Sequence, residues 1–309
     1  MKKITKLILL CLALAFSNSI WAQEEDDLLA ELEGELEEPI YYTAYSFKST
    51  RIINGHSIER MQHRQLDFRI NHRFGQINEG GYALWGLDNA IINFSFEYGL
   101  TDNIMIGLRR GTNKKVYDLS SKFTLLRQST GRVTMPVSVS YYTNVSYKTQ
   151  RGFLDLPDIR DADFVTNRLR MGYAHQLLIA RKFTEALTIQ LSPTYVHRNY
   201  VAYGEQNDVY ALGFGGRYKF VNRVAFMWEY FYTSSHNGTA DNGVTYYNPL
   251  AIGFDIETGG HVFQLFFTNT KPMVEDAVIA ETTGNWTDGG IYFGFNMSRV
   301  FAIPSKKHH

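Results

Sequence analysis

Residues 291–301 read IYFGFNMSRVF, and this stretch decides the fold class. From Phe293 every second residue is large and apolar for three positions, whereas Gly294 and Asn296 between them are small or polar. Because side chains alternate across a strand, the pattern predicts one apolar face and one polar face. Arg299 falls on the apolar side, so the surroundings of that face are expected to change near this residue.

The same two-residue period recurs along most of the chain. It predicts about twelve strands, within a range of roughly ten to fourteen. Their approximate ranges are 65–75, 90–98, 103–110, 115–127, 134–147, 166–181, 185–198, 207–219, 222–234, 245–256, 260–270 and 289–302. Strands of this length match the 9–11 residues that a tilted strand needs to cross a bilayer. A soluble β-sandwich also has this period and remains an alternative.

The connections between the predicted strands alternate in length. LTDN (100–103) and FTE (183–185) are short, whereas NYVAYGEQND (199–208) and the stretch 271–288 are long. Several apolar faces also end in tyrosine, as an interfacial girdle would. We therefore predict an all-β, transmembrane, antiparallel up-and-down β-barrel with short periplasmic turns and long extracellular loops. Within the long stretch, EDAVIAET (275–282) has some helical periodicity.

The first residues predict export. MKKITK is basic, LILLCLALAF is a short apolar run, and Ala22 precedes a plausible cleavage point, which is typical of a signal peptide over 1–22. Residues 23–40 form an acidic segment that we expect in the periplasm. Residues 41–64 contain Asn54-Gly55, a hairpin signal. This part is predicted to be a hairpin or plug, either inside the barrel or beneath it, before the barrel at 65–303 and a tail at 304–309.

Composition excludes several classes of function. Cys11 is the single cysteine, so disulfides, thiol catalysis and cysteine metal sites are not expected after cleavage. The sequence has no G-x-S-x-G elbow, phosphate loop or nucleic-acid motif, and its histidines lack metal-ligand spacing. We expect no catalytic residue, cofactor or metal. From Pro39 onward, 28 basic residues face 22 acidic ones.

Charged residues on the polar faces are predicted to line the lumen, because charge facing lipid is costly. The candidates are Asp67, Arg69, Arg73, Glu97, Arg109, Asp118, Lys122, Arg168, Arg170, Arg217, Lys219, Glu229, Asp255 and Glu257. They are interpreted either as the wall of a weakly anion-selective pore or as a cross-strand network that fills a narrow barrel. The two interpretations overlap.

Two details concern single strands. In the last strand, Phe293, Phe295 and Phe301 are candidates for the signal that barrel-assembly machinery reads, and Arg299 is placed near the periplasmic membrane edge. His175 falls on the predicted lipid face. A β-bulge in its strand is the preferred explanation, and a contact with another protein is the alternative.

The chain resembles a family of outer-membrane β-barrel proteins of unknown function from Gram-negative bacteria. The resemblance is carried by STRIINGHSIE (49–59), LDFRINHRFG (66–75), YALWGLDNAIINFSFEYGLTDNIMIGLRR (82–110), LSSKFTLLRQ (119–128) and YFGFNMSRVF (292–301). Its most specific block is Trp85–Asp102, with Trp85 where the family usually has phenylalanine. The resemblance implies the fold and the outer-membrane location, but no catalytic residues.

A small-solute channel or transporter with a charged lumen is the predicted function. One alternative is a structural or interaction barrel that recruits a periplasmic or surface partner, and another is a lipid-modifying enzyme. The expected partners are outer-membrane lipid, the barrel-assembly machinery and a small polar or anionic solute, with no nucleic acid. The barrel is expected to be a monomer.

Overall fold

A computed structural model describes residues 38–151, 167–234, 238–239 and 243–304. The predicted signal peptide, most of the acidic segment at 23–40 and most of the tail at 304–309 lie outside these residues. Contact clustering separates residues 1–40 from residues 41–309, and the second unit contains the barrel. No helix in the described part of the chain is long and apolar enough to cross a membrane.

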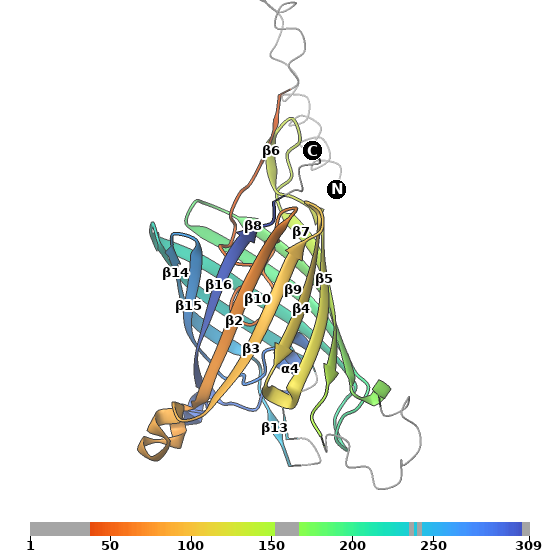
Figure 1. The fold of residues 1–309 in the computed structure, drawn as a ribbon, viewed down its shortest axis with the longest axis vertical. Coiled ribbons are helices and arrows are strands. Elements are labelled where there is room, and N and C mark those ends of the chain that lie inside the picture. The colour runs from red at the N-terminus through yellow and green to blue at the C-terminus, as the bar shows by residue number, and fades with distance from the viewer. Residues whose placement is uncertain (1–37, 152–166, 235–237, 240–242, 305–309) are drawn as a thin grey trace, which may run out of the picture. The chain divides into compact units, whose positions relative to one another are not determined.

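Twelve strands of the described chain form one closed antiparallel barrel (Figure 1). They are β2 (Gln65–Gln76), β3 (Ala90–Gly99), β4 (Ile104–Gly111), β5 (Val116–Leu126), β7 (Ser138–Lys148), β8 (Met171–Lys182), β9 (Leu187–Arg198), β10 (Asp208–Val221), β11 (Val224–Thr233), β14 (Leu250–Thr258), β15 (His261–Thr268) and β16 (Tyr292–Ala302). Sequence neighbours pair around the wall, and β16 pairs with β2 to close it. The predicted fold class and strand number are confirmed.

Short elements lie outside the wall. β1 (Ile40–Tyr42) and β6 (Ser129–Gly131) form a separate two-stranded sheet, as do β12 (Gly238–Thr239) and β13 (Thr245–Tyr246). The short helical elements are η1 (Ile77–Glu79), η2 (Gly81–Gly86), η3 (Asn113–Lys115), α4 (Glu275–Ala280) and η4 (Trp286–Asp288). The stretch 275–282, in which the sequence has some helical periodicity, contains α4, which ends at Ala280.

Strand boundaries differ from the prediction where local chemistry interrupts the period. The strand predicted over 245–256 is split, because Pro249 precedes β14 and has no N–H to donate to a ladder. Thr245 and Tyr246 pair with β12 instead. The strand predicted from residue 166 begins only at Met171.

The predicted bulge at His175 is wrong. Its strand keeps a regular register with both neighbours, pairing with Thr143 on one side and Tyr195 on the other. His175 faces outward, half-buried, and its Nδ1 lies 2.7 Å from the Tyr141 hydroxyl and 3.0 Å from Thr143 Oγ1. Its ring stacks near the rings of Tyr141 and Tyr195. Hydrogen-bonding side chains on β7 and an aromatic ring on β9, rather than a bulge, accommodate this polar ring.

The two faces of the wall differ as the alternating pattern requires. Outward side chains such as Phe94, Leu108, Leu119 and Phe254 are exposed, whereas their sequence neighbours are buried. On β16, Phe293 packs on Phe74 and Phe267, Phe295 stacks on His72, and Phe301 is exposed beside Arg299. The exposed apolar face is the one that meets lipid in a transmembrane barrel.

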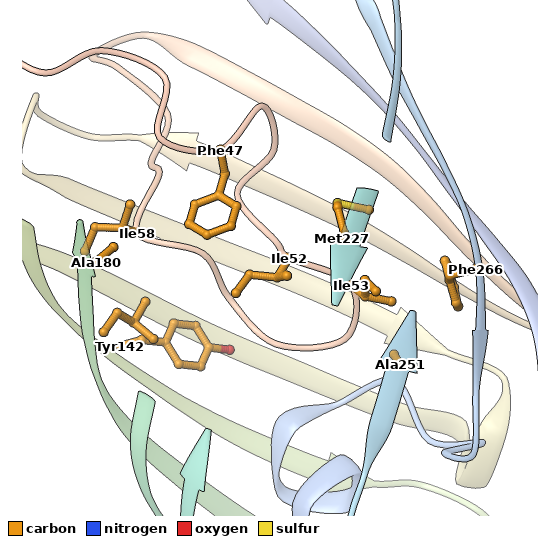
Figure 2. Packing of buried hydrophobic residues seen from close by; sticks show 10 residues of the cluster. Phe47, Ile52, Ile53, Ile58, Tyr142, Ala180, Met227, Ala251 and Phe266 are labelled. Atoms are coloured by element: carbon orange, nitrogen blue, oxygen red, sulfur yellow. The ribbon is translucent and has the colours of Figure 1, made fainter. Parts of the chain in front are cut away.

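The barrel interior is filled by two segments that are not part of the wall. Phe47, Ile52, Ile53 and Ile58 are buried and pack against inward side chains of the strands (Figure 2). We call residues 46–58 the plug. The second segment, residues 269–282, connects β15 to β16, includes α4, and is almost wholly buried. We call it the inward loop.

Candidate functional site

Ten of the fourteen predicted lumen residues are buried inside the barrel. They are Asp67, Arg69, Arg73, Glu97, Arg109, Asp118, Lys122, Arg217, Glu229 and Asp255. Glu257 and Lys219 are half-buried near the end of the barrel that carries the short turns. Arg168 and Arg170 do not belong to the wall: both precede β8, and Arg168 is exposed. Their strand begins later than its sequence pattern predicted.

Glu229 of β11 holds the tip of the plug. Its carboxylate accepts hydrogen bonds from three successive backbone N–H groups, those of Ile53 (3.2 Å), Asn54 (3.2 Å) and Gly55 (3.0 Å). The tip is a tight turn, because the Ile52 N–H donates to the Gly55 carbonyl at 3.0 Å. A side chain added at Gly55 would approach the Phe231 ring to 3.0 Å, so the small residue is needed there.

Lys122 of β5 holds the two arms of the plug. Its ammonium donates to the carbonyl groups of Thr50 (3.3 Å), Ser57 (2.9 Å) and Glu59 (2.6 Å). Side-chain amides from three further strands donate to other plug carbonyls: Gln190 to His56, Gln264 to Ile52 and Asn296 to Ile53. Buried backbone groups need partners, and here wall side chains supply them in place of a sheet or helix.

Glu275 of α4 joins the inward loop to both the plug and the wall. Its carboxylate accepts a hydrogen bond from Arg51 of the plug at 2.9 Å and is bound by Arg109 of β4. The Tyr142 hydroxyl of β7 also donates to it, at 3.1 Å. Arg109 Nε donates in turn to Asp118 at 2.6 Å. The plug, the inward loop and two nearby wall strands, β4 and β7, therefore meet at one buried carboxylate.

The charges in this central cluster balance. Its buried basic residues are Arg51, Arg69, Arg109 and Lys122, and its buried acidic residues are Asp67, Glu97, Asp118 and Glu275. His56 lies among them, with Nε2 at 3.0 Å from Arg51 Nη2 and its ring 3.9 Å from the Tyr142 ring. A neutral His56 can accept from Arg51 and leaves the balance unchanged. Buried charge is tolerated when it is paired in this way.

The pKa values of His56 in the plug and Glu275 in the inward loop follow from these contacts. Burial and the nearby Arg51 and Lys122 lower the pKa of His56 well below its usual range, which keeps the ring neutral. Burial alone would raise the pKa of Glu275, but Arg109 and Arg51 outweigh it, so the pKa is lowered and the carboxylate stays ionised. His56 thus adds no charge to the cluster, and the ionised Glu275 pairs with the guanidinium groups of Arg51 and Arg109.

The inward loop is fitted to the wall along its length. Asp276 accepts a hydrogen bond from Ser146 Oγ at 2.8 Å, and a side chain at Gly172 would come within 2.3 Å of the Asp276 carboxylate. Ile279 and Ala280 pack in one apolar cluster that includes Val196. The sequence analysis missed this loop. Its signal was a small group of apolar residues at inward positions of β8, β9 and β10, where a water-filled lumen would favour polar ones: Ala174, Val196, Val209 and Ala211.

Cavities remain at both ends of the barrel. One of about 640 Å³ lies at the short-turn end, bounded by the plug and by Arg60, Asp102 and Arg127. Another of about 340 Å³ lies at the long-loop end, beside Lys114, Arg198 and Glu281. The plug and the inward loop occupy the space between these two groups of residues. The part of the chain that the structure describes contains no cluster of three or more potential metal ligands.

The comparisons with solved structures concern the fold. The NanC porin is 9% identical over 77% of this chain and 100% of its own, with a TM-score of 0.44. The KdgM porin is 7% identical over 77% of this chain and 99% of its own, with a TM-score of 0.44. Omp33 of Acinetobacter baumannii is 8% identical over 77% and 98%, with a TM-score of 0.43.

The comparison with protein families covers nearly all of the barrel and the plug. No curated protein matches the sequence. Residues 47–301 match the model of a membrane-bound beta barrel domain, DUF5777. The match begins within the plug and ends in β16, so the plug is part of the matched domain. The chain belongs to this family of membrane-bound β-barrels.

Proposed function

We propose that this protein is a gated small-solute channel of the bacterial outer membrane, closed in the conformation described above. The observation that carries the proposal is the way the plug is held. Its backbone is bound by polar side chains from strands around the whole wall, and it adds little to the sheet itself. A segment bound by side chains can move without breaking the barrel.

The two end cavities support a transport path. One cavity lies at each mouth of the barrel, and the plug and the inward loop lie between them. Once the plug and the inward loop move, the charged wall residues of the central cluster line the transport path. The energy needed is substantial, because several buried charges would lose partners together, so the closed state dominates, and openings without a trigger are brief and infrequent.

A reversible cross-link tests this gate. Cys11 lies in the predicted signal peptide, so introduced cysteines would be the only thiols of the mature chain. A side chain at Gly215 of β10 would come within 2.7 Å of Ile52 Cδ1, which makes Ile52→Cys with Gly215→Cys a suitable pair. We expect the reduced protein to open intermittently in planar bilayers, the oxidised one to stay closed, and a reductant to restore opening.

The controls separate the gate from the channel. Each single cysteine variant should behave alike with and without oxidant. Equal conductance in the oxidised and reduced double variant would overturn the plug as the gate. The Glu229→Ala variant, whose plug is loosened, should conduct as well. If neither this variant nor the reduced protein conducts, although both form folded barrels, the proposed channel is overturned.

A second candidate function, an interaction barrel, is favoured by the loop between β2 and β3. Tyr82 is fully exposed, and Leu84 and Trp85 are about half exposed at its tip. Both Leu84 and Trp85 have positive φ, and Gly86 packs against the backbone of Gly75, so the tip is held in one shape. Co-purification of a partner that is lost in a Tyr82→Ser, Trp85→Ser variant would support this function over the channel.

A further inference from the structure

The cavity at the long-loop end carries an excess of positive charge. Among the described residues that line it, four are basic, namely Lys114, Lys148, Arg198 and Lys271, and two are acidic, namely Glu205 and Glu281. The central cluster, in contrast, is balanced. A concave site with unbalanced charge attracts counter-charged solutes and raises their local concentration.

Glu281 draws three of these basic side chains together. Its carboxylate lies 2.5 Å from the Lys114 ammonium, 2.9 Å from that of Lys148 and 3.9 Å from the Arg198 guanidinium. The three cations come from η3, β7 and β9, whereas Glu281 directly follows α4 on the inward loop. A single carboxylate on a movable segment thus occupies a basic pocket built by the wall and its loops.

The electrostatics of Glu281 agree with this geometry. Burial opposes its ionisation, but Lys148, Lys114 and Arg198 outweigh burial and lower its pKa strongly. Arg198 has a second partner in Glu205, at 3.2 Å, and Glu205 also accepts from the Tyr246 hydroxyl. The two carboxylates are fully engaged, and the basic residues still outnumber them.

We propose that this cavity is a binding site for a small polycarboxylate anion, and that the Glu281 carboxylate is a built-in occupant that such an anion displaces. A volume of about 340 Å³ is within the range of small-molecule sites. A ligand with three carboxylates matches the pocket better than Glu281 alone, because together with Glu205 it carries as many negative charges as the four basic residues carry positive ones. A neutral solute gains nothing from them.

Displacement would act on the gate. Glu281 directly follows α4, and Glu275, the carboxylate at the centre of the cluster, is the first residue of this helix. Releasing Glu281 removes the ionic contacts at the end of α4 and leaves the Thr282 carbonyl, which accepts from the Tyr247 N–H at 2.9 Å, as the adjacent contact. This inference deepens the proposed channel by naming its class of solute and its trigger, but the binding itself does not depend on conduction.

The test is equilibrium binding of citrate to the full-length protein in detergent, measured by titration calorimetry with glucose as the neutral comparison. We expect saturable citrate binding and none for glucose. Lys148→Gln and Lys114→Gln should each weaken citrate binding about tenfold or more, since each removes a charge that faces the ligand. Glu281→Gln should strengthen it about tenfold, because the internal competitor is gone.

The opposite signs of these neighbouring changes make the test decisive. If Glu281 served only the fold, Glu281→Gln would leave citrate binding unchanged or weaken it, and either result would overturn the proposal. Equal binding of citrate and glucose would also overturn it. So would the absence of saturable citrate binding in both proteins, the parent and Glu281→Gln. Glu257→Gln, at the other end of the barrel, is the matched control and should change nothing.

Heat-modifiable gel mobility identifies variants that still form a closed barrel. Lys114 has a partly exposed side chain, so Lys114→Gln keeps the test usable if Lys148→Gln fails to fold. A failure of conductance with intact citrate binding would reject the channel and leave the site standing. Conductance without citrate binding would reject the site and leave the channel standing.

Discussion

Arg51 and Glu275 are separated by 224 positions in the chain, yet their side chains meet at 2.9 Å inside the barrel. Arg51 belongs to the plug and Glu275 to the inward loop. Each side chain is about 2% exposed, so each charge offsets part of the cost of burying the other, and Arg109 provides Glu275 with a second cation. The two segments that close the lumen are therefore coupled, and changing either one should affect the other.

Glu275→Gln should loosen the whole closure. The change leaves Arg51 and Arg109 buried with less negative charge, and removing one partner of a buried ion pair costs about 3–5 kcal/mol. We expect a lower temperature for the loss of heat-modifiable mobility and faster hydrogen exchange in residues 46–58. Glu185→Gln, whose side chain is 87% exposed, is the control and should leave both unchanged. Unchanged exchange in the plug of Glu275→Gln would contradict the coupling.

Glu229→Gln should act on the tip of the plug alone. The amide has one acceptor oxygen in place of two, so at least one of the backbone N–H groups of residues 53–55 loses its partner, at a cost of about 1–3 kcal/mol. Hydrogen exchange of these three amides should accelerate while the wall strands keep their protection. Acceleration spread evenly over the wall would mean that Glu229 stabilises the barrel rather than the plug.

Acidification should destabilise the closed state in two steps. The pKa of His56 is lowered in the fold, so below about pH 6.5 the unfolded chain binds a proton that the folded one does not, and stability falls. The pKa values of Glu275 and Glu281 are also lowered, so their contribution persists above about pH 4.5 and is lost at lower pH. Stability is thus greatest at neutral pH.

His56→Gln isolates the first step. It should remove the loss of stability between pH 6.5 and 5, which is at most about 1.4 kcal/mol per pH unit for one group. Thermal unfolding across this range would measure it, with the exposed His63→Gln as the comparison. The same slope in both variants and the parent would show that His56 is not the responsible group.

Charge placed in the middle of β16 should impair assembly far more than charge removed from its end. Phe295 lies on the outward face and stacks on His72, so Phe295→Arg puts a cation near the bilayer centre at about 2–4 kcal/mol. Arg299 is exposed near the end of the strand, and Arg299→Ala should cost little. The heat-modifiable fraction recovered from membranes measures both, and equal effects would mean that the strand is misplaced relative to the membrane.

Gly86→Ala should disorganise the aromatic loop tip. Gly86 has φ +86°, and an added Cβ would lie 2.4 Å from the Gly75 backbone, so both the backbone conformation and the packing resist a side chain. A side chain at Gly81 in the same loop would meet nothing within 4 Å, and Gly81→Ala is the matched control. Protease nicking of the loop should increase in the first variant only. Equal nicking would show that the tip is not held by this contact.

The outer face of the barrel was predictable because lipid imposes one simple rule on alternate residues. Phe94, Leu108 and Phe293 meet that rule independently of their neighbours, so each strand could be assigned separately. The start of β8 was misjudged because residues 167–170 precede the strand although they were assigned to it from the period. His175 was misjudged because its polarity is accommodated by partners on adjacent strands, which no single strand displays.

The charged residues of the inner face could be predicted from the sequence, but the contacts that they make could not. The sequence alone determined the closed barrel, its strand order and the charged side chains that point inward, since these follow from local alternation and loop lengths. Only the tertiary structure decided that the lumen is closed, that plug residues occupy it, and that Arg51 pairs with Glu275. These contacts join segments far apart in the chain, and their partners are chosen by shape and charge balance in three dimensions, for which the sequence has no local signal.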